Sequence, residues 1–193
     1  MVTNLNRKQH YYTLEEYFAL EKVGDARYEY WDGEIFCMSG GSKEHYRLTR
    51  NIYRWLDRVV QGGKCEAFMP DTPITTPKLP PYRYPDASVV CGESRFENIH
   101  GIDALVNPIL IVEVLSPTTE LADKEDKRIA YQAIESLQEY VLIAQDKVEV
   151  THYTRKGDLW FRDVVSDLST SLQLTSLAST ITLAELYRGV VSQ

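Results

Sequence analysis

The stretch Asn107 to Pro117, NPILIVEVLSP, determines how the rest of the sequence can be arranged. Isoleucine, leucine and valine fill positions 109 to 115 except for Glu113, and Asn-Pro and Ser-Pro bound the run. These proline pairs neither continue a ladder nor freely begin a helix, so the pattern predicts a central strand buried on both faces. Because successive side chains alternate between faces, Glu113 should project from an otherwise apolar surface.

A carboxylate in that position needs a partner. An unpaired charge on an apolar face would cost several kcal/mol, which a bound cation, a lysine or arginine, or a raised pKa of Glu113 must offset. The alternative is an ion pair with an arginine that serves the fold alone.

The composition is that of an ordinary soluble protein, with 25% charged and 44% apolar residues and a net charge of −7. We expect one domain over residues 1–193, since 193 residues are too few for two comfortable ones. No window approaches the roughly 18 apolar residues of a membrane span, so we expect no membrane partner. The charge disfavours general adhesion to nucleic acid, which would therefore need a local basic patch.

The cysteines bear on the compartment. Cys37, Cys65 and Cys91 are odd in number and widely spaced, and the N-terminus lacks the apolar core of a secretory signal. These features favour a reducing, cytoplasmic setting, and the absence of a CxxC pair argues against structural zinc.

Local patterns place the remaining elements. Polar or extended connections are expected at 78–85 and 93–106, and the other expected elements follow in chain order. They are a helix from the Thr13–Glu16 capping box to about 21, a hairpin over 27–38 around Asp32-Gly33, a helix over about 43–60, strands at 65–69, 72–76 and 86–91, the Glu113 strand, a helix over about 121–135, strands at 140–144, 148–154 and 160–165, and a short helix from a capping box at Thr182–Glu185.

The long helix over about 43–60 carries a line of basic side chains, which we call the basic ridge. It consists of Lys43, Arg47, Arg50, Arg54 and Arg58. Their spacing gives one stripe flanking the apolar face, which can follow the phosphates of a nucleic acid because arginine makes forked contacts with phosphate. The alternative is a solvated face that pairs with the protein's own carboxylates.

A second carboxylate, Asp86, stands at the entry of the strand before the Glu113 strand. Two carboxylates on neighbouring strands can hold Mg²⁺ or Mn²⁺, with water in the remaining positions. Such a metal suits hydrolysis of a phosphate ester, and a nearby lysine can position the attacking water. Lys127 is the candidate, because it shares a helical stripe with Ala130 and Tyr131 that should pack on the sheet near Glu113. The alternative is a lysine that merely covers the helix flank.

These motifs in order resemble those of the PD-(D/E)xK nuclease superfamily. They are Pro85-Asp86, Glu113-Val-Leu115, and the helix with Asp126-Lys127 and Tyr131. The segments TLEEYFALE, RYEYWDGEIF, GSKEHYRL, YPDASVV and SLQEYVLI look like the Uma-two family of restriction-endonuclease-like proteins, over about residues 12–187.

The resemblance implies a restriction-endonuclease-like α/β core, in which a mixed central sheet is flanked by helices and preceded by an N-terminal helix and hairpin. It implies Mg²⁺ at Asp86 and Glu113, with the usual lysine moved from position 115, here Leu115, to Lys127. It also places His45 at the nucleic-acid cleft. The alternative for His45 is a helix-end residue that completes local hydrogen bonds.

Two functions remain. The first is a Mg²⁺-dependent endonuclease that cuts DNA, with Asp86, Glu113 and Lys127 as catalytic residues and His45 and the basic ridge as the nucleic-acid surface. A homodimer would suit cleavage of both strands of a duplex. The second is a non-catalytic nucleic-acid or protein interaction module, in which Glu113 and Lys127 form a buried ion pair.

Overall fold

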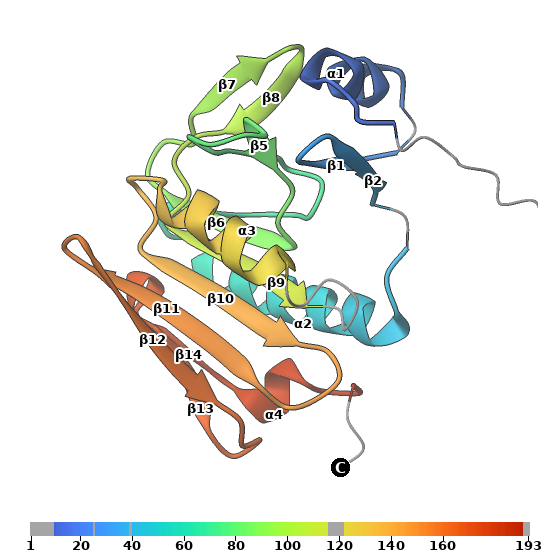
Figure 1. Cartoon of the computed structure of the whole chain (residues 1–193). Coiled ribbons are helices and arrows are strands. Elements are labelled where there is room, and N and C mark those ends of the chain that lie inside the picture. The colour runs from blue at the N-terminus through green and yellow to red at the C-terminus, as the bar shows by residue number, and fades with distance from the viewer. Residues whose placement is uncertain (1–9, 25, 39, 116–121, 191–193) are drawn as a thin grey trace, which may run out of the picture. The chain divides into compact units, whose positions relative to one another are not determined.

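Strand β9 (Leu110–Leu115) lies inside a six-stranded sheet, as its apolar run predicts (Figure 1). The strand order is β12-β11-β10-β9-β6-β3. β9 is parallel to β10 (Glu139–Ala144) and antiparallel to β6 (Ala87–Cys91), so the sheet is mixed. The other strands are β3 (Cys65–Phe68), β11 (Val150–Lys156) and β12 (Leu159–Val165). The predicted α/β class is confirmed.

The structure is a computed structural model that describes residues 10–24, 26–38, 40–115 and 122–190. Its internal contacts group the chain into two units, of which the first ends at Gly40 and the second begins at Gly41. The Ser-Pro pair that follows the apolar run and the predicted helix start at 121 lie outside the described residues.

The first unit contains the predicted helix and hairpin. Helix α1 (Leu14–Val23) opens with a capping box, in which Thr13 Oγ1 accepts from the Glu16 N–H and Glu16 accepts from the Thr13 N–H. Strands β1 (Tyr28–Trp31) and β2 (Glu34–Cys37) are joined by Asp32-Gly33, and both turn residues have positive φ. This is the conformation that two-residue hairpin turns require.

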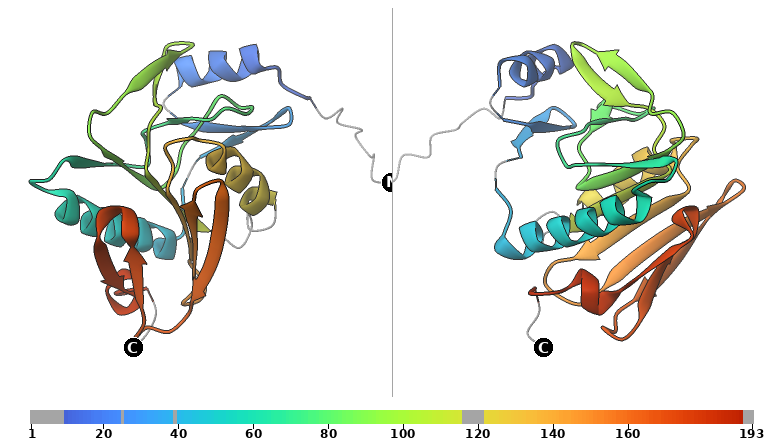
Figure 2. Two further views of the ribbon diagram at one scale, coloured as in Figure 1. Left: turned by 90° about the vertical axis from the view of Figure 1, so that its left-hand side faces the viewer. Right: turned by 180° about the vertical axis from the view of Figure 1, so that it is seen from behind.

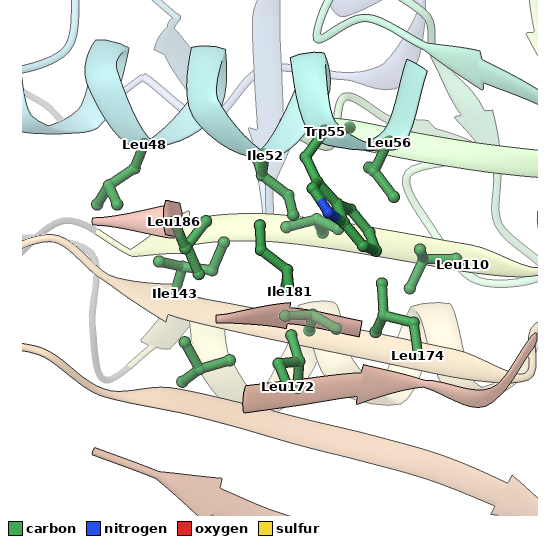
Figure 3. Close-up of a cluster of buried hydrophobic side chains, with 14 of the residues drawn as sticks. Leu48, Ile52, Trp55, Leu56, Leu110, Ile143, Leu172, Leu174, Ile181 and Leu186 are labelled. Carbon is green, nitrogen blue, oxygen red and sulfur yellow. The ribbon is translucent and has the colours of Figure 1, made fainter. Parts of the chain in front are cut away.

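One face of the six-stranded sheet is covered by α2 (Lys43–Val60) and the C-terminal segment (Figures 2 and 3). That segment comprises β13 (Ser171–Leu174), η1 (Thr175–Leu177), β14 (Ser179–Thr182) and α4 (Leu183–Leu186). Leu48, Ile52 and Trp55 of α2 pack with Leu172 and Ile181 of the hairpin in one buried cluster. The burial of these apolar side chains holds α2 against the sheet. The position of α2 in turn determines where His45, in its first turn, lies.

The opposite face is covered by α3 (Ala122–Gln132). Tyr131 and Ile134 pack with Ile111 of β9 and Leu142 of β10 in a second buried cluster. β9 therefore buries both faces, and Glu113 lies on the α3 side by alternation with Ile111. A separate four-stranded sheet has the order β5-β4-β8-β7. Its strands are β4 (Ile74–Thr75), β5 (Tyr82–Arg83), β7 (Phe96–Ile99) and β8 (Ile102–Leu105).

Two hairpins were absent from the sequence prediction. The 93–106 connection contains β7 and β8, and the chain after β12 contains β13 and β14. All four strands have only four residues. β7 is mostly exposed, and β13 alternates between exposed and buried residues over a stretch that contains only two apolar positions. His100-Gly101, with positive φ at both residues, was the missed turn signal.

The prediction of three lone cysteines was wrong. Cys65 and Cys91 are direct partners across β3 and β6 and form a disulfide, while Cys37 is free and exposed. The cysteine count therefore gives no ground for a reducing compartment. No described helix has the length and apolar character needed to span a membrane.

Candidate metal and nuclease site

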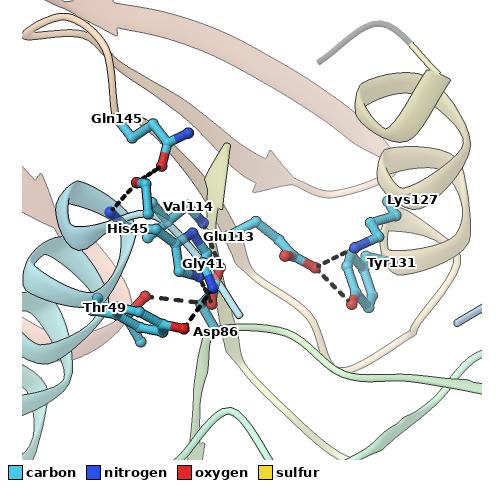
Figure 4. A network of polar contacts seen from close by, with 11 residues as sticks. Gly41, His45, Thr49, Asp86, Glu113, Val114, Lys127, Tyr131 and Gln145 are labelled. Atoms are coloured by element: carbon cyan, nitrogen blue, oxygen red, sulfur yellow. Dashed lines mark hydrogen bonds and ion pairs between the residues drawn. The ribbon is translucent and has the colours of Figure 1, made fainter. Parts of the chain in front are cut away.

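The Glu113 carboxylate is buried, with 7% of the residue exposed, and is held by side chains from α3. Its Oε1 accepts a hydrogen bond from the Tyr131 hydroxyl at 2.9 Å, and Lys127 Nζ lies 3.7 Å from the same oxygen (Figure 4). Lys127 and Tyr131 are four residues apart, so they share one face of the helix. The buried carboxylate thus has a cation and a hydroxyl donor in contact.

Asp86 immediately precedes β6 and contacts both the neighbouring strand of the sheet, β9, and helix α2. Its Oδ2 accepts from the Val114 backbone N–H at 2.7 Å. Its Oδ1 lies 3.0 Å from His45 Nε2 and 3.4 Å from Thr49 Oγ1. His45 and Thr49 are also four residues apart, so α2 presents both to Asp86 from one face.

Strand pairing brings the two carboxylates to the same end of β6 and β9. Ala87 pairs with Val112, so Asp86 comes next to Glu113, and its bond to the Val114 N–H lies one residue further along β9. Figure 4 shows the Asp86 carboxylate directed towards the α2 residues and the Glu113 carboxylate towards the α3 residues. The site thus consists of two carboxylates at one end of the paired strands, which are directed towards helices that cover opposite faces of the sheet.

The electrostatics link the two groups further. The hydrogen bond with Asp86 raises the pKa of His45 above the usual 6.5; burial opposes this, and the charges of Asp86 and Glu113 add to the increase. The His45 backbone N–H donates to Ser42 Oγ, and Ser42 Oγ donates to Gln145 Oε1. These bonds connect the start of α2 to the end of β10. The raised pKa means that the His45 imidazole stays protonated up to a higher pH than an ordinary histidine.

The basic ridge is exposed, but four of its members have contacts within the chain. Lys43 Nζ lies 3.5 Å from Glu44 Oε1 and Arg50 Nη2 donates to Asn51 Oδ1 at 3.1 Å, both on α2 itself, while the other two contact the C-terminal segment. Arg47 Nη1 donates to the Gly189 carbonyl, and Arg58 Nη2 contacts Glu185 Oε1, both at 2.8 Å. An α-helix turns by about 100° per residue, so the ridge lies roughly opposite the buried face and not beside it. The predicted flanking position is corrected by this geometry. Arg50 and Arg54 are exposed on the outer side of α2.

Sequence reasoning missed Thr49, Ser42 and Gln145 and gave Tyr131 no role. The signals were the spacings of Thr49 after His45 and of Tyr131 after Lys127, each one helical turn. The link from Ser42 to Gln145 joins residues 103 positions apart, so no local pattern could have shown it.

A divalent cation can be tested against the donor atoms present. Among the described residues, no group of three or more His, Cys, Asp or Glu side chains is placed to hold a metal ion. Asp86 and Glu113 nevertheless supply carboxylate oxygens on neighbouring strands, the donor type that Mg²⁺ prefers when water fills its other positions. The donor chemistry fits Mg²⁺ or Mn²⁺, and binding through both carboxylates stays a prediction.

A second buried carboxylate lies elsewhere in the sheet. Glu139, at the start of β10, is fully buried and accepts hydrogen bonds from the backbone N–H groups of Thr175 and Ser176 at 3.0 and 2.8 Å. The hydroxyls of the same two residues and His152 Nε2 also contact it. Both oxygens are therefore bonded, which is typical of a carboxylate that holds a hairpin in place.

Comparison with known proteins identifies the family. The family model Uma2, described as "Putative restriction endonuclease", matches residues 14–184. The uncharacterized protein slr1290 of Synechocystis sp. is 32% identical over 176 residues, which cover 91% of each chain. The uncharacterized protein sll1609 of the same organism is 36% identical over 146 residues, covering 76% of this chain and 82% of its own.

One solved structure shows the fold. It is the crystal structure of "a putative nuclease belonging to DUF820" from Anabaena variabilis, with a TM-score of 0.71 and 22% sequence identity. The match covers 93% of this chain and 99% of the other.

Proposed function

Because the chain belongs to the Uma2 family of restriction-endonuclease-like proteins, we propose that it is a divalent-metal-dependent endonuclease that hydrolyses DNA phosphodiester bonds. One observation carries the proposal. Asp86 and Glu113 lie at the same end of β6 and β9, and each has a nitrogen donor beside it, His45 at 3.0 Å and Lys127 at 3.7 Å. A structural ion pair accounts for Glu113 with Lys127 alone, whereas the proposal also uses the second acid, Asp86, and the histidine beside it.

Each side chain has a proposed role. Asp86 and Glu113 would hold Mg²⁺ or Mn²⁺, which neutralises phosphate charge and lowers the pKa of a bound water. Lys127 stabilises the developing negative charge on the phosphate, and Tyr131 orients Glu113 by donating to Oε1. His45 holds a proton at Nε2 beside Asp86.

The test combines metal binding with cleavage. Mn²⁺ or Mg²⁺ should raise the melting temperature of the full chain, because a ligand bound to the folded state stabilises it. Asp86→Asn and Glu113→Gln should each abolish that shift and the cleavage of DNA. As a matched control, Glu185→Gln changes a carboxylate on α4 and should retain both. An unchanged melting temperature with no cleavage would refute the proposal.

The second candidate is a non-catalytic interaction module. It is favoured by the buried contact of Lys127 with Glu113 and by Leu115, which stands where the superfamily usually has lysine. This module should bind nucleic acid or protein without a metal-dependent shift in melting temperature, and Glu113→Gln should leave that binding unchanged.

The basic ridge gives a separate test of DNA as the partner. Arg50→Gln with Arg54→Gln should weaken binding about equally on unrelated sequences, and should flatten the dependence of log affinity on log salt by roughly one to two units. Arg47→Gln with Arg58→Gln is the comparison, since these two side chains contact the C-terminal segment. This pair should mainly lower the free energy of unfolding, by about 1 kcal/mol or less. Identical salt slopes for wild type and the first variant would remove the ridge from DNA binding.

A further inference from the structure

Strand β12 forms one edge of the six-stranded sheet and, within the described part of the chain, pairs with β11 alone. It has seven residues, without proline or glycine, and most of them are exposed. Leu159 and Phe161 are 65% and 49% exposed although both are apolar. A long open edge with apolar side chains is a template for pairing with another strand.

The direction of the backbone groups on β12 follows from its neighbour. The Arg155 N–H of β11 donates to the Gln138 carbonyl on the β10 side, at 2.8 Å. Backbone groups alternate in direction along a strand, so Thr154 directs its N–H and C=O towards β12, where its partner is Phe161. Phe161 therefore faces β11, and the residues on either side of it direct their backbone groups outward.

Three residues of β12 thus point backbone groups to the outer edge, namely Trp160, Arg162 and Val164. The Val164 N–H already donates to Oδ1 of Asp163, at 2.9 Å. The side chain of Asp163 therefore blocks the edge at that end. The open part of the edge consists of Trp160 and Arg162, symmetrically placed about Phe161.

We infer that this edge pairs antiparallel with the same edge of a second copy of the chain, in the register that places Phe161 opposite itself. A two-fold axis requires that if one residue faces another, the reverse pair also forms. In this register Trp160 of each copy faces Arg162 of the other, and the two pairs form about four backbone hydrogen bonds. None of these bonds needs the Val164 N–H.

The neighbouring registers are worse. Moving the centre of the pair from Phe161 to Arg162 places the two Arg162 side chains opposite each other, so like charges meet. The same register pairs Trp160 with Val164, whose N–H already donates to Asp163. A further shift places Asp163 opposite itself and still uses Val164. A shift in the other direction centres the pair on Trp160 and shortens the overlap to residues 159–161.

Side-chain chemistry explains why the partner is a second copy. In the inferred register an indole faces a guanidinium on one face of the sheet, an arrangement that favours cation–π contact, and it occurs twice. On the other face the two Phe161 rings meet at a non-hydrogen-bonded position, with Cα atoms about 4.5 Å apart. The edge is therefore complementary to itself.

Cysteine cross-linking tests the register on the full chain. In a Cys37→Ser background, which removes the exposed free thiol, Phe161→Cys should form a disulfide-linked dimer on oxidation, because the two Cα atoms are within disulfide range. Asp163→Cys is the matched control, since its two copies would lie about 13 Å apart along the strands. Cross-linking of Asp163→Cys without Phe161→Cys would overturn the register.

Sedimentation equilibrium tests the dimer independently of any cleavage. Wild type should be a dimer, and Arg162→Pro should raise the dimer dissociation constant at least tenfold, because it removes an outward N–H that β11 does not use. Val164→Pro removes the outward N–H of Val164, which lies outside the interface, and should leave the dimer intact. A monomeric wild type, or equal weakening by both prolines, would overturn the inference.

Discussion

Glu113 and Glu139 are two buried carboxylates on adjacent parallel strands, and their surroundings differ in kind. Glu139 is bonded on both oxygens by backbone and side-chain donors of η1 and by His152. Glu113 has a lysine and a tyrosine on Oε1, and a second carboxylate, Asp86, comes next to it across the strand pair. Burial alone therefore does not identify a functional carboxylate. The kind of partner does: backbone donors around Glu139 fix a hairpin, whereas Glu113 has a lysine cation in contact and a second acid, Asp86, next to it in the strand register.

The largest expected effect is a loss of activity, which should follow from a change at Glu113 but not from one at Glu139. Glu113→Gln should abolish metal-dependent DNA cleavage and leave the protein folded, because the amide keeps the shape and can still accept the Tyr131 hydrogen bond. The free energy of unfolding should fall by about 1 to 3 kcal/mol, because Lys127 loses its buried charge partner. Cleavage assays and urea unfolding on the same preparation measure both. If Glu113→Gln unfolds the protein, the two carboxylates play the same structural role and the comparison fails.

A smaller effect is expected from Glu139→Gln, and it falls on stability. The Gln NH₂ group would face a donor that now binds a carboxylate oxygen, so the free energy of unfolding should fall by about 2 to 4 kcal/mol. Cleavage per folded molecule should stay within the error of wild type. A selective loss of cleavage by a fully folded Glu139→Gln protein would contradict the assignment.

The smallest effect is a pH dependence. Burial raises the pKa of Glu139, but hydrogen bonds from His152 and Ser176 outweigh it and leave the pKa below the ordinary 4.5. A carboxyl group with a lowered folded-state pKa stabilises the fold above its unfolded pKa, and that stabilisation is lost as the pH falls through the folded value. The stability difference between wild type and Glu139→Gln should therefore be constant near neutral pH and shrink below about pH 4.5. Chemical unfolding over that range measures it, and a difference that grows on acidification would have the wrong sign.

Sequence patterns predicted those parts of the fold that depend on local signals. The apolar run of β9, the length of α2 and the caps at Thr13 and Thr182 depend on residues within one turn or one strand of each other. The β7–β8 and β13–β14 hairpins were missed because strands of four residues give a short pattern: β7 is mostly exposed, and the alternation of β13 covers only two apolar positions.

The candidate site divides in the same way. Strand alternation and the helical stripe predicted that Lys127 and Glu113 approach each other. The bond from the Val114 N–H to Asp86 and the disulfide between Cys65 and Cys91 depend on strand register, which tertiary packing sets. The predicted flanking position of the basic ridge was wrong although the residue numbers determine it, because at about 100° per residue the ridge lies roughly opposite the buried positions of α2.

The disulfide between Cys65 and Cys91 also determines whether a single proteolytic cut between them separates the chain into two fragments. The bond joins residues 26 positions apart, so it encloses β4, β5 and Asp86 in a covalent ring. Pro77, Lys78 and Leu79 are exposed within that ring, and trypsin can reach the bond after Lys78. A chain cut once at that bond remains a single covalent molecule, because the disulfide still joins the two fragments. Asp86, in the second fragment, stays attached to the first until a thiol reductant breaks the disulfide.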